Sequence, residues 1–229
     1  MNGPVWALAE FNNYLIAGGQ FTLAGGATID YIASWDGSNW SALGNGTSAQ
    51  VHILAVYDGK LIAGGWFGIA GAVVANYIAS WDGANWSALG SGVTGGGNTG
   101  VYALVVYDGR LIAGGTFTSA GGVSANCIAA WDGSSWSALG SGIGGSNVGV
   151  SDLTVFDGRL IAAGTFVTAG GVGVNNIAAW NGTEWEALGA GMNKSVFGLT
   201  SLNNRLIAGG VFTKAGGDSV SYVAEWKMR

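Results

Sequence analysis

Few side chains in this chain could do chemistry, and about half of its carboxylates occupy one repeated setting. Six of the thirteen acidic residues come directly before a glycine. They are Asp36, Asp58, Asp82, Asp108, Asp132 and Asp157. An Asp-Gly pair favours a tight turn, because aspartate bonds nearby backbone and glycine accepts positive φ angles. These six carboxylates are therefore predicted to form turns.

The other acidic residues have no spacing that indicates the carboxylate pair of a glycoside hydrolase. They are Glu10, Asp30, Asp152, Glu184, Glu186, Asp218 and Glu225. A glycoside hydrolase stays an alternative, for which loss of turnover in Asp152→Asn would be the evidence. His52 is the only histidine and Cys127 the only cysteine, so neither a metal centre nor a Ser-His-Asp assembly is expected. We predict no catalytic residue, no metal and no cofactor.

Aromatic side chains are the remaining candidates. Nine of the eleven tryptophans recur at fixed positions, where pairing across a hairpin accounts for them. Trp6 and Trp66 belong to no such repeated column. Together with His52 and Tyr102, they could present aromatic faces to a ligand.

The elements that position these residues come from an internal repeat. The string Leu-Ile-Ala-Gly/Ala-Gly recurs after 46, 50, 49 and 46 residues. Its copies start at Leu15, Leu61, Leu111, Leu160 and Leu206. Periods of this length are typical of propellers, solenoids and arrays. We number the repeat units 1 to 5, with approximate bounds 5–50, 51–100, 101–149, 150–195 and 196–229.

Each unit is predicted to form four short strands. In unit 3 these cover Val101 to Tyr107, Leu111 to Phe117, Cys127 to Trp131 and Trp136 to Leu139, with a loop at Gly121-Gly122. Short strands between glycine turns, without a helical period, indicate an all-β protein. Four antiparallel strands in about 48 residues form a propeller blade. The prediction is a single domain, residues 1–229, built as a closed five-bladed β-propeller.

Unit 5 is shorter than the others. It stops after Trp226-Lys227-Met228-Arg229 and lacks the Trp-Ser-Ala-Leu-Gly segment of the earlier units. We expect a three-stranded blade without an outer strand, at a genuine chain end. Glu225, Lys227 and Arg229 would put charges on its edge, which discourages strand addition by other chains.

The repeats resemble those of kelch and galactose-oxidase propellers. That family has a Gly-Gly pair after the second strand, an aromatic residue on the third and a tryptophan on the fourth. Leu111-Ile112-Ala113-Gly114-Gly115 and Trp131-Asp132-Gly133-Ser134-Ser135-Trp136 fit this pattern, with tryptophan where the family usually has tyrosine. Glycine-rich repeats of bacterial surface propellers are similar as well. The resemblance implies blade architecture and not a function, because such propellers include enzymes, actin binders and substrate receptors.

Two variable columns mark a candidate ligand surface. The second residue of the first strand is Trp6, His52, Tyr102, Ser151 or Phe197. The residue after the glycine pair, or after its equivalent Ala163-Gly164, is Gln20, Trp66, Thr116, Thr165 or Val211. An antiparallel hairpin brings the columns together, on the face that also holds the loops of variable length between units. The predicted ligand-binding residues are Trp6, Gln20, His52, Trp66, Asn98 and Tyr102, although neutral drift would also produce variable columns.

Composition excludes several classes of protein. Glycine supplies 44 residues, charged residues 9% and hydrophobic residues 49%, which excludes disorder and, without a Gly-X-Y period, collagen. A net charge of −5 without a basic cluster argues against nucleic acid. The twenty-one uncharged residues between Lys60 and Asp82 are long enough to span a bilayer, but their glycines and their recurrence favour β-structure and no membrane span.

The expected function is a non-catalytic binding or scaffold module, with a glycan or a protein as ligand. Aromatic faces stack on the apolar faces of sugars, and a repeated scaffold lets weak sites act together. A protein-interaction propeller would use the same face, and a recently amplified repeat could have no dedicated ligand. We expect a monomer, or a dimer through the incomplete fifth unit. An extracellular or cell-surface location is expected if a signal sequence has been removed.

Overall fold

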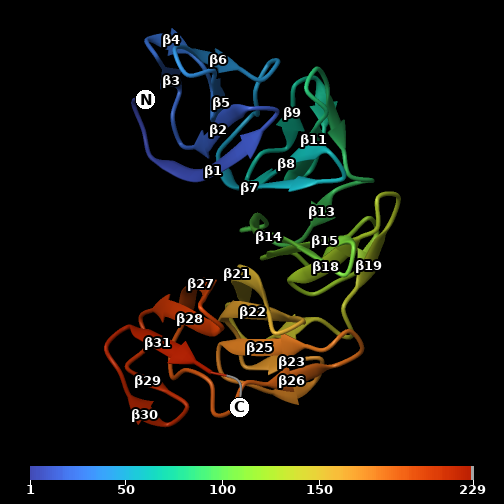
Figure 1. The fold of residues 1–229 in the computed structure, drawn as a ribbon. Coiled ribbons are helices and arrows are strands. Elements are labelled where there is room, and N and C mark those ends of the chain that lie inside the picture. Colours follow the sequence, from blue (N-terminus) through green and yellow to red (C-terminus); the bar gives the residue numbers. More distant parts are fainter. Residues whose placement is uncertain (228–229) are drawn as a thin grey trace.

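The computed structural model describes residues 1–227 and shows five β-sheets arranged in an arc, one for each repeat unit (Figure 1). Units 1 to 4 each form a four-stranded antiparallel sheet, and unit 5 forms a three-stranded one. The expected missing outer strand of unit 5 is thus confirmed for the described residues. Of the three charges predicted on its edge, Arg229 lies outside the described residues.

The strands recur in the same order in every unit. The inner strands are β1 (Val5–Phe11), β7 (Val51–Tyr57), β14 (Val101–Tyr107), β21 (Gly149–Phe156) and β27 (Val196–Leu202). The second strands are β2 (Tyr14–Gly19), β8 (Lys60–Gly65), β15 (Arg110–Gly115), β22 (Arg159–Thr165) and β28 (Arg205–Gly210). The third strands are β5 (Ile32–Trp35), β11 (Ile78–Trp81), β18 (Ile128–Trp131), β25 (Ile177–Trp180) and β31 (Val223–Trp226). The outer strands are β6 (Trp40–Ala42), β12 (Trp86–Ala88), β19 (Trp136–Ala138) and β26 (Trp185–Ala187).

Each unit also contains a small hairpin that was predicted to be a loop. In unit 3 it pairs Ser119 with Ser124 and Ala120 with Val123, and the Gly-Gly pair forms its turn with positive φ at both residues. The hairpins are β3 (Leu23–Ala24) with β4 (Ala27–Thr28), β9 (Ile69–Ala70) with β10 (Val73–Val74), β16 (Ser119–Ala120) with β17 (Val123–Ser124), β23 (Thr168–Ala169) with β24 (Val172–Gly173), and β29 (Lys214–Ala215) with β30 (Asp218–Ser219). Two-residue strands carry too little alternation to be recognised in a sequence.

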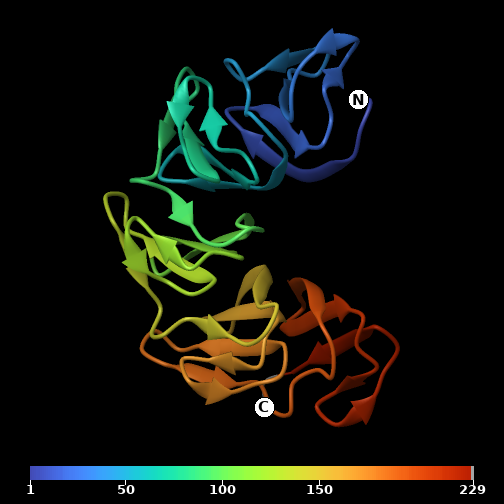
Figure 2. The same cartoon turned by 180° about the vertical axis from the view of Figure 1, so that it is seen from behind.

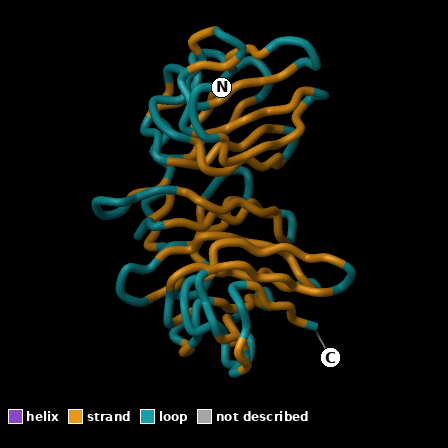
Figure 3. Tube along the Cα trace, turned by 90° about the vertical axis from the view of Figure 1, so that its left-hand side faces the viewer, coloured by secondary structure: helices purple, strands orange, loops and turns teal. Residues whose placement is uncertain are grey.

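The hairpins and the segments that connect successive units lie on one face. The connecting strand β13 (Val93–Thr94) pairs with β16 of the next unit, and β20 (Ile143–Gly144) pairs in the same way with β23. The tight turns lie at the other ends of the strands. This two-faced arrangement agrees with the prediction, and Figure 3 shows the loops and turns at both ends of the strands.

Tryptophans and phenylalanines fix one unit on the next. The repeated tryptophans pair within each hairpin, as expected, with ring centroids 5.3 Å apart for Trp131 and Trp136. The indole Nε1 of Trp136 then donates a hydrogen bond of 2.8 Å to the carbonyl oxygen of Leu89 in unit 2. The repeated phenylalanine, such as Phe117, is fully buried. The hydrophobic core is therefore a series of seams between sheets.

The arc is not a closed ring. The inner strands β1, β7, β14, β21 and β27 lie side by side in chain order, but Figures 1 and 2 both show an opening between units 1 and 5. The prediction that five units close on themselves is wrong. The rotation from one unit to the next, which is set by packing at each seam, is too small for five units to complete the circle.

The uncharged stretch between Lys60 and Asp82 forms strands β8 to β11, as predicted. No helix within residues 1–227 has the length and apolar character that crossing a bilayer requires.

Candidate ligand-binding site

The first variable column sits on a β-bulge in every unit. The register between the inner and second strands shifts between Val5 and Ala7, so Trp6 has no partner in the ladder. His52 and Tyr102 occupy the same position in units 2 and 3. A bulge bends a strand and redirects a side chain. This geometry explains why the column tolerates varied residues. The sequence contains no signal that predicts the bulge.

Three neighbouring bulges bring aromatic rings together, as the two-column argument predicted. The imidazole of His52 stacks on the indole of Trp6, with centroids 4.4 Å apart and planes inclined by 19°. It also lies 5.0 Å from Trp66 and 5.2 Å from Tyr102. We call these four residues the aromatic cluster. Trp6 is 41% exposed and Trp66 46% exposed, so both indoles remain open to solvent.

Trp66 is held by its surroundings on three sides. Its Nε1 donates a hydrogen bond of 2.7 Å to the hydroxyl oxygen of Tyr102, and its backbone N–H donates to the carbonyl of Gln50. The indole packs against the backbone of Gly100, where a Cβ atom would lie 2.5 Å from Cδ1 of Trp66. Glycine at position 100 therefore makes room for this orientation of the ring.

His52 contacts the three other rings of the aromatic cluster. Burial lowers the pKa of His52 below its ordinary value of 6.5, because the charged form is disfavoured away from water. Its Nε2 is buried and has no hydrogen-bond partner among the described residues. At neutral pH the cluster is therefore uncharged and offers ring faces together with the Tyr102 hydroxyl.

Gln20 and Asn98 are placed differently from the four rings. Both are exposed. The backbone N–H of Gln20 donates to the carbonyl of Pro4, and the carbonyl of Asn98 accepts from the hydroxyl of Thr116. In the described part of the chain, no side-chain hydrogen bond joins either residue to the aromatic cluster. The structure thus brings four of the six predicted residues together.

All six Asp-Gly pairs lie in turns, as predicted, but in two ways: three of the carboxylates accept backbone N–H groups, whereas Asp58, Asp108 and Asp157 take positive φ themselves. The carboxylate of Asp132 accepts the backbone N–H groups of Ser134 and Ser135. These bonds and those from the two hydroxyls hold the pKa of Asp132 well below its usual range. In the equivalent turns of units 1 and 2, Asp36 and Asp82 each accept the backbone N–H groups of the residues two and three positions further along the chain.

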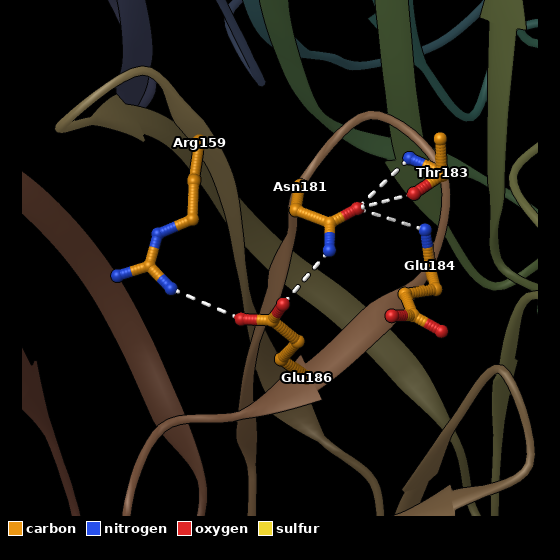
Figure 4. Close-up of polar contacts among 5 residues, drawn as sticks. All are labelled: Arg159, Asn181, Thr183, Glu184 and Glu186. Atoms are coloured by element: carbon orange, nitrogen blue, oxygen red, sulfur yellow. Dashed lines mark hydrogen bonds and ion pairs between the residues drawn. The ribbon is translucent and has the colours of Figure 1, made fainter.

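In unit 4 an asparagine takes the place of the turn aspartate (Figure 4). The side-chain oxygen of Asn181 accepts the backbone N–H groups of Thr183 and Glu184. Its Nδ2 donates to Glu186, which also forms an ion pair with Arg159 at 3.1 Å. Glu186 is therefore engaged in holding the turn, and Figure 4 shows Glu184 directed away from that contact.

Asp152 is a carboxylate of the inner strand β21, and its pKa is raised. Burial raises it, while hydrogen bonds from the backbone N–H groups of Leu199 and Leu153 oppose the shift. The two oxygens accept these groups at 2.6 Å from Leu199 and 2.8 Å from Leu153. Asp152 thus links unit 4 to unit 5.

No group of three or more histidine, cysteine, aspartate or glutamate side chains is arranged to hold a metal ion in residues 1–227. Burial raises the pKa of the Cys127 thiol to about 11, so this thiol stays protonated. A hollow of about 330 Å³ lies on the turn face, where Asn12, Asp36 and Trp81 are among its lining residues. The aromatic cluster lies on the opposite face and does not line this hollow.

The comparisons with known proteins address the architecture. A family described as a domain of unknown function, the DUF5122 β-propeller, matches residues 108–129 and 157–178. The WD40 β-propeller domain of Doa1 superposes with a TM-score of 0.54 at 14% identity, over 91% of this chain and 62% of that one. The computationally designed Ika8 protein gives 0.50 at 17% identity, over 99% and 72%. The architecture is that of a β-propeller.

The two matched segments lie at equivalent places in the propeller. Each starts at an Asp-Gly turn and runs through the second strand and the small hairpin into the third strand. The chain spans less than two thirds of the length of the WD40 propeller that it matches. A search of curated proteins found no match.

Proposed function

We propose that this propeller is a non-catalytic binding module whose aromatic cluster takes a neutral carbohydrate. The observation that supports it is the pair of half-exposed indoles, Trp6 and Trp66, both packed against the partly buried imidazole of His52. Tryptophan provides a large, rigid and amphipathic contact area at a low cost in conformational entropy. A sugar ring has apolar faces that stack on such a surface.

Support by neighbouring residues favours binding. Trp6 rests on His52, and Trp66 is fixed by the Tyr102 hydroxyl and by the backbone at Gly100. Side chains that are ordered before binding lose less freedom when a ligand arrives. The Tyr102 hydroxyl accepts one hydrogen bond and keeps its own O–H for a ligand hydroxyl.

Charge favours a neutral ligand over an anionic one. The four rings are uncharged at neutral pH, and the chain has a net charge of −5. Stacking on half-exposed indoles leaves part of a small ligand in water, so affinities are expected to be in the millimolar to micromolar range. A cell-surface or secreted location belongs to this proposal, because glycans are displayed there. So does the kelch-like assignment of the five blades, which rests on the glycine pair and the two tryptophans.

The test is a glycan array of neutral oligosaccharides, followed by titration calorimetry with the best ligand. Trp66→Ala and Trp6→Ala should each weaken binding about tenfold or more, as truncation of a central aromatic residue does. Phe197→Ala is the matched control, because Phe197 occupies the same bulge position in unit 5 and is 58% exposed. It should bind like the unmodified chain.

Other outcomes would decide against the proposal. No binding across the array, with a specific protein bound through Trp66, would favour a protein-interaction propeller. No dependence on either tryptophan would favour an amplified repeat without a ligand at this surface. Turnover of an oligosaccharide that is lost in Asp152→Asn would favour the glycoside hydrolase.

A further inference from the structure

The two ends of the arc expose complementary halves of the seam that joins successive units. At each internal seam the first valine of an inner strand packs on a glycine or alanine of the preceding unit. These valines are fully buried: Val51, Val101, Val150 and Val196. The fit leaves no spare room, since a Cβ on Gly64 would lie 2.6 Å from Cγ1 of Val101.

In unit 1 the projecting half of this seam is exposed among residues 1–227. Val5, the equivalent of Val101, is 40% exposed. Leu8 is 61% exposed, although its equivalent Leu104 is 9% exposed. Leu15 is 40% exposed, and its equivalents Leu61, Leu111 and Leu160 are fully buried.

In unit 5 no described residue covers the receiving half. A Cβ on Gly209, the equivalent of Gly64, would meet no atom within 4 Å. Val223 is 59% exposed, whereas the isoleucines at its position in units 1 to 4 are fully buried. Exposed contiguous apolar surface of this kind marks an interaction site.

We infer that a second copy of this chain docks here, with unit 5 of one copy packed on unit 1 of the other. The four internal seams identify the partner. At each of them the projecting face of one unit is covered by the receiving face of another unit of the same repeat, so the surface that fits an exposed half is a further copy of the repeat. Both halves of the seam occur in one chain. The contact continues the existing seam and joins two different surfaces, so it is heterologous and propagates into a ring or a longer assembly.

This contact differs from pairing along the free edge of β31. Edge pairing would use the backbone of Val223–Trp226 and would leave Gly209 untouched. Face docking buries Gly209 under a valine of the partner copy. A side chain at position 209 therefore distinguishes the two modes.

The experiment measures mass by sedimentation or light scattering at chain concentrations up to about 1 mM. The unmodified chain should exceed the monomer mass. Gly209→Val blocks the receiving face and Leu15→Glu blocks the projecting face, so each variant alone should be monomeric, with the association constant reduced at least tenfold. An equimolar mixture should form a one-to-one complex, because each variant keeps the half that the other has lost. Val74→Glu is the control, at a 67% exposed site on the unit 2 hairpin, and it should associate normally.

A monomeric unmodified chain would overturn the inference, and so would unchanged association of Gly209→Val. Failure of the mixture to form a complex, with both variants folded by circular dichroism, would overturn the head-to-tail arrangement. If Gly209→Val does not fold, Val223→Glu blocks the same face and carries the same expectation.

Discussion

His52 lies with its imidazole stacked on the indole of Trp6, 4.4 Å between centroids, and buries an Nε2 atom that has no hydrogen-bond partner among the described residues. The contact crosses the seam between units 1 and 2. The stability of that seam therefore depends on the protonation state of His52.

The first prediction concerns pH. The pKa of His52 is lowered in the folded state by burial, from 6.5. As pH falls through 6.5, His52 becomes protonated in the unfolded chain but stays neutral in the folded chain, so the free energy of unfolding decreases. Above that pH His52 is neutral in both states and contributes no change. His52→Phe keeps an aromatic ring and should remove this part of the decrease between pH 7.5 and 5.5 in urea unfolding. Equal slopes for both proteins would contradict the assignment.

The second prediction concerns the position of Trp66. Gly100→Ala places a Cβ against the indole, so the ring must move and its hydrogen bond to Tyr102 should weaken. We expect a changed near-ultraviolet dichroism, weaker ligand binding and about 1–3 kcal/mol of destabilisation. Gly149→Ala is the control at the equivalent position, directly before the first valine of the next inner strand, where the Cβ would lie 2.9 Å from Cγ2 of Thr116 and 3.8 Å from the carbonyl oxygen of Gly115 and would touch no aromatic ring. Identical aromatic spectra for the two variants would show that Gly100 does not seat the indole.

The third prediction compares two tryptophans at the same repeat position. Trp136→Phe removes the hydrogen bond to the buried seam at Leu89, and loss of a buried partner costs about 1–3 kcal/mol. Trp40→Phe removes the same atoms in unit 1, where the indole Nε1 has no hydrogen-bond partner among the described residues. Thermal unfolding should show Trp136→Phe to be the more destabilising by at least about 1 kcal/mol. A difference of zero would mean that the bond across the seam adds nothing to stability.

Much of this fold was predictable because the same pattern of strand and turn residues occurs in each of the five units. The turn at Asp132 and the pairing of Trp131 with Trp136 follow from local chemistry, and the structure has both. Whether the ring closes was not predictable. Closure depends on the rotation of each unit relative to the preceding one, summed over all units, and no local sequence pattern indicates this rotation. The exposed Val5 and the open site at Gly209 are the residues at which the expectation of a closed ring fails.

The aromatic cluster was located by comparing units with one another. His52 and Tyr102 stood out as the residues that differ where other positions are the same. The bulge at this position was not predictable. A bulge depends on strand register, and the residues that occupy it are of a different type in every unit. The role of Asp152 was also hidden, because its partner, the backbone N–H of Leu199, lies in another unit.

The last prediction tests that link between units 4 and 5. Asp152→Ala leaves the Leu199 N–H without its acceptor, at a cost of about 1–3 kcal/mol, and amide exchange at Leu199 should become faster. Asp152→Asn keeps one acceptor oxygen and should have a smaller effect. The Leu104 amide is the internal control, because Leu104 is the equivalent of Leu199 in unit 3 and the position of Asp152 in the preceding unit 2 is Ile53, which offers no side-chain acceptor. Unchanged exchange at Leu199 in Asp152→Ala would show that this carboxylate does not hold unit 5, and its burial would then require a different explanation.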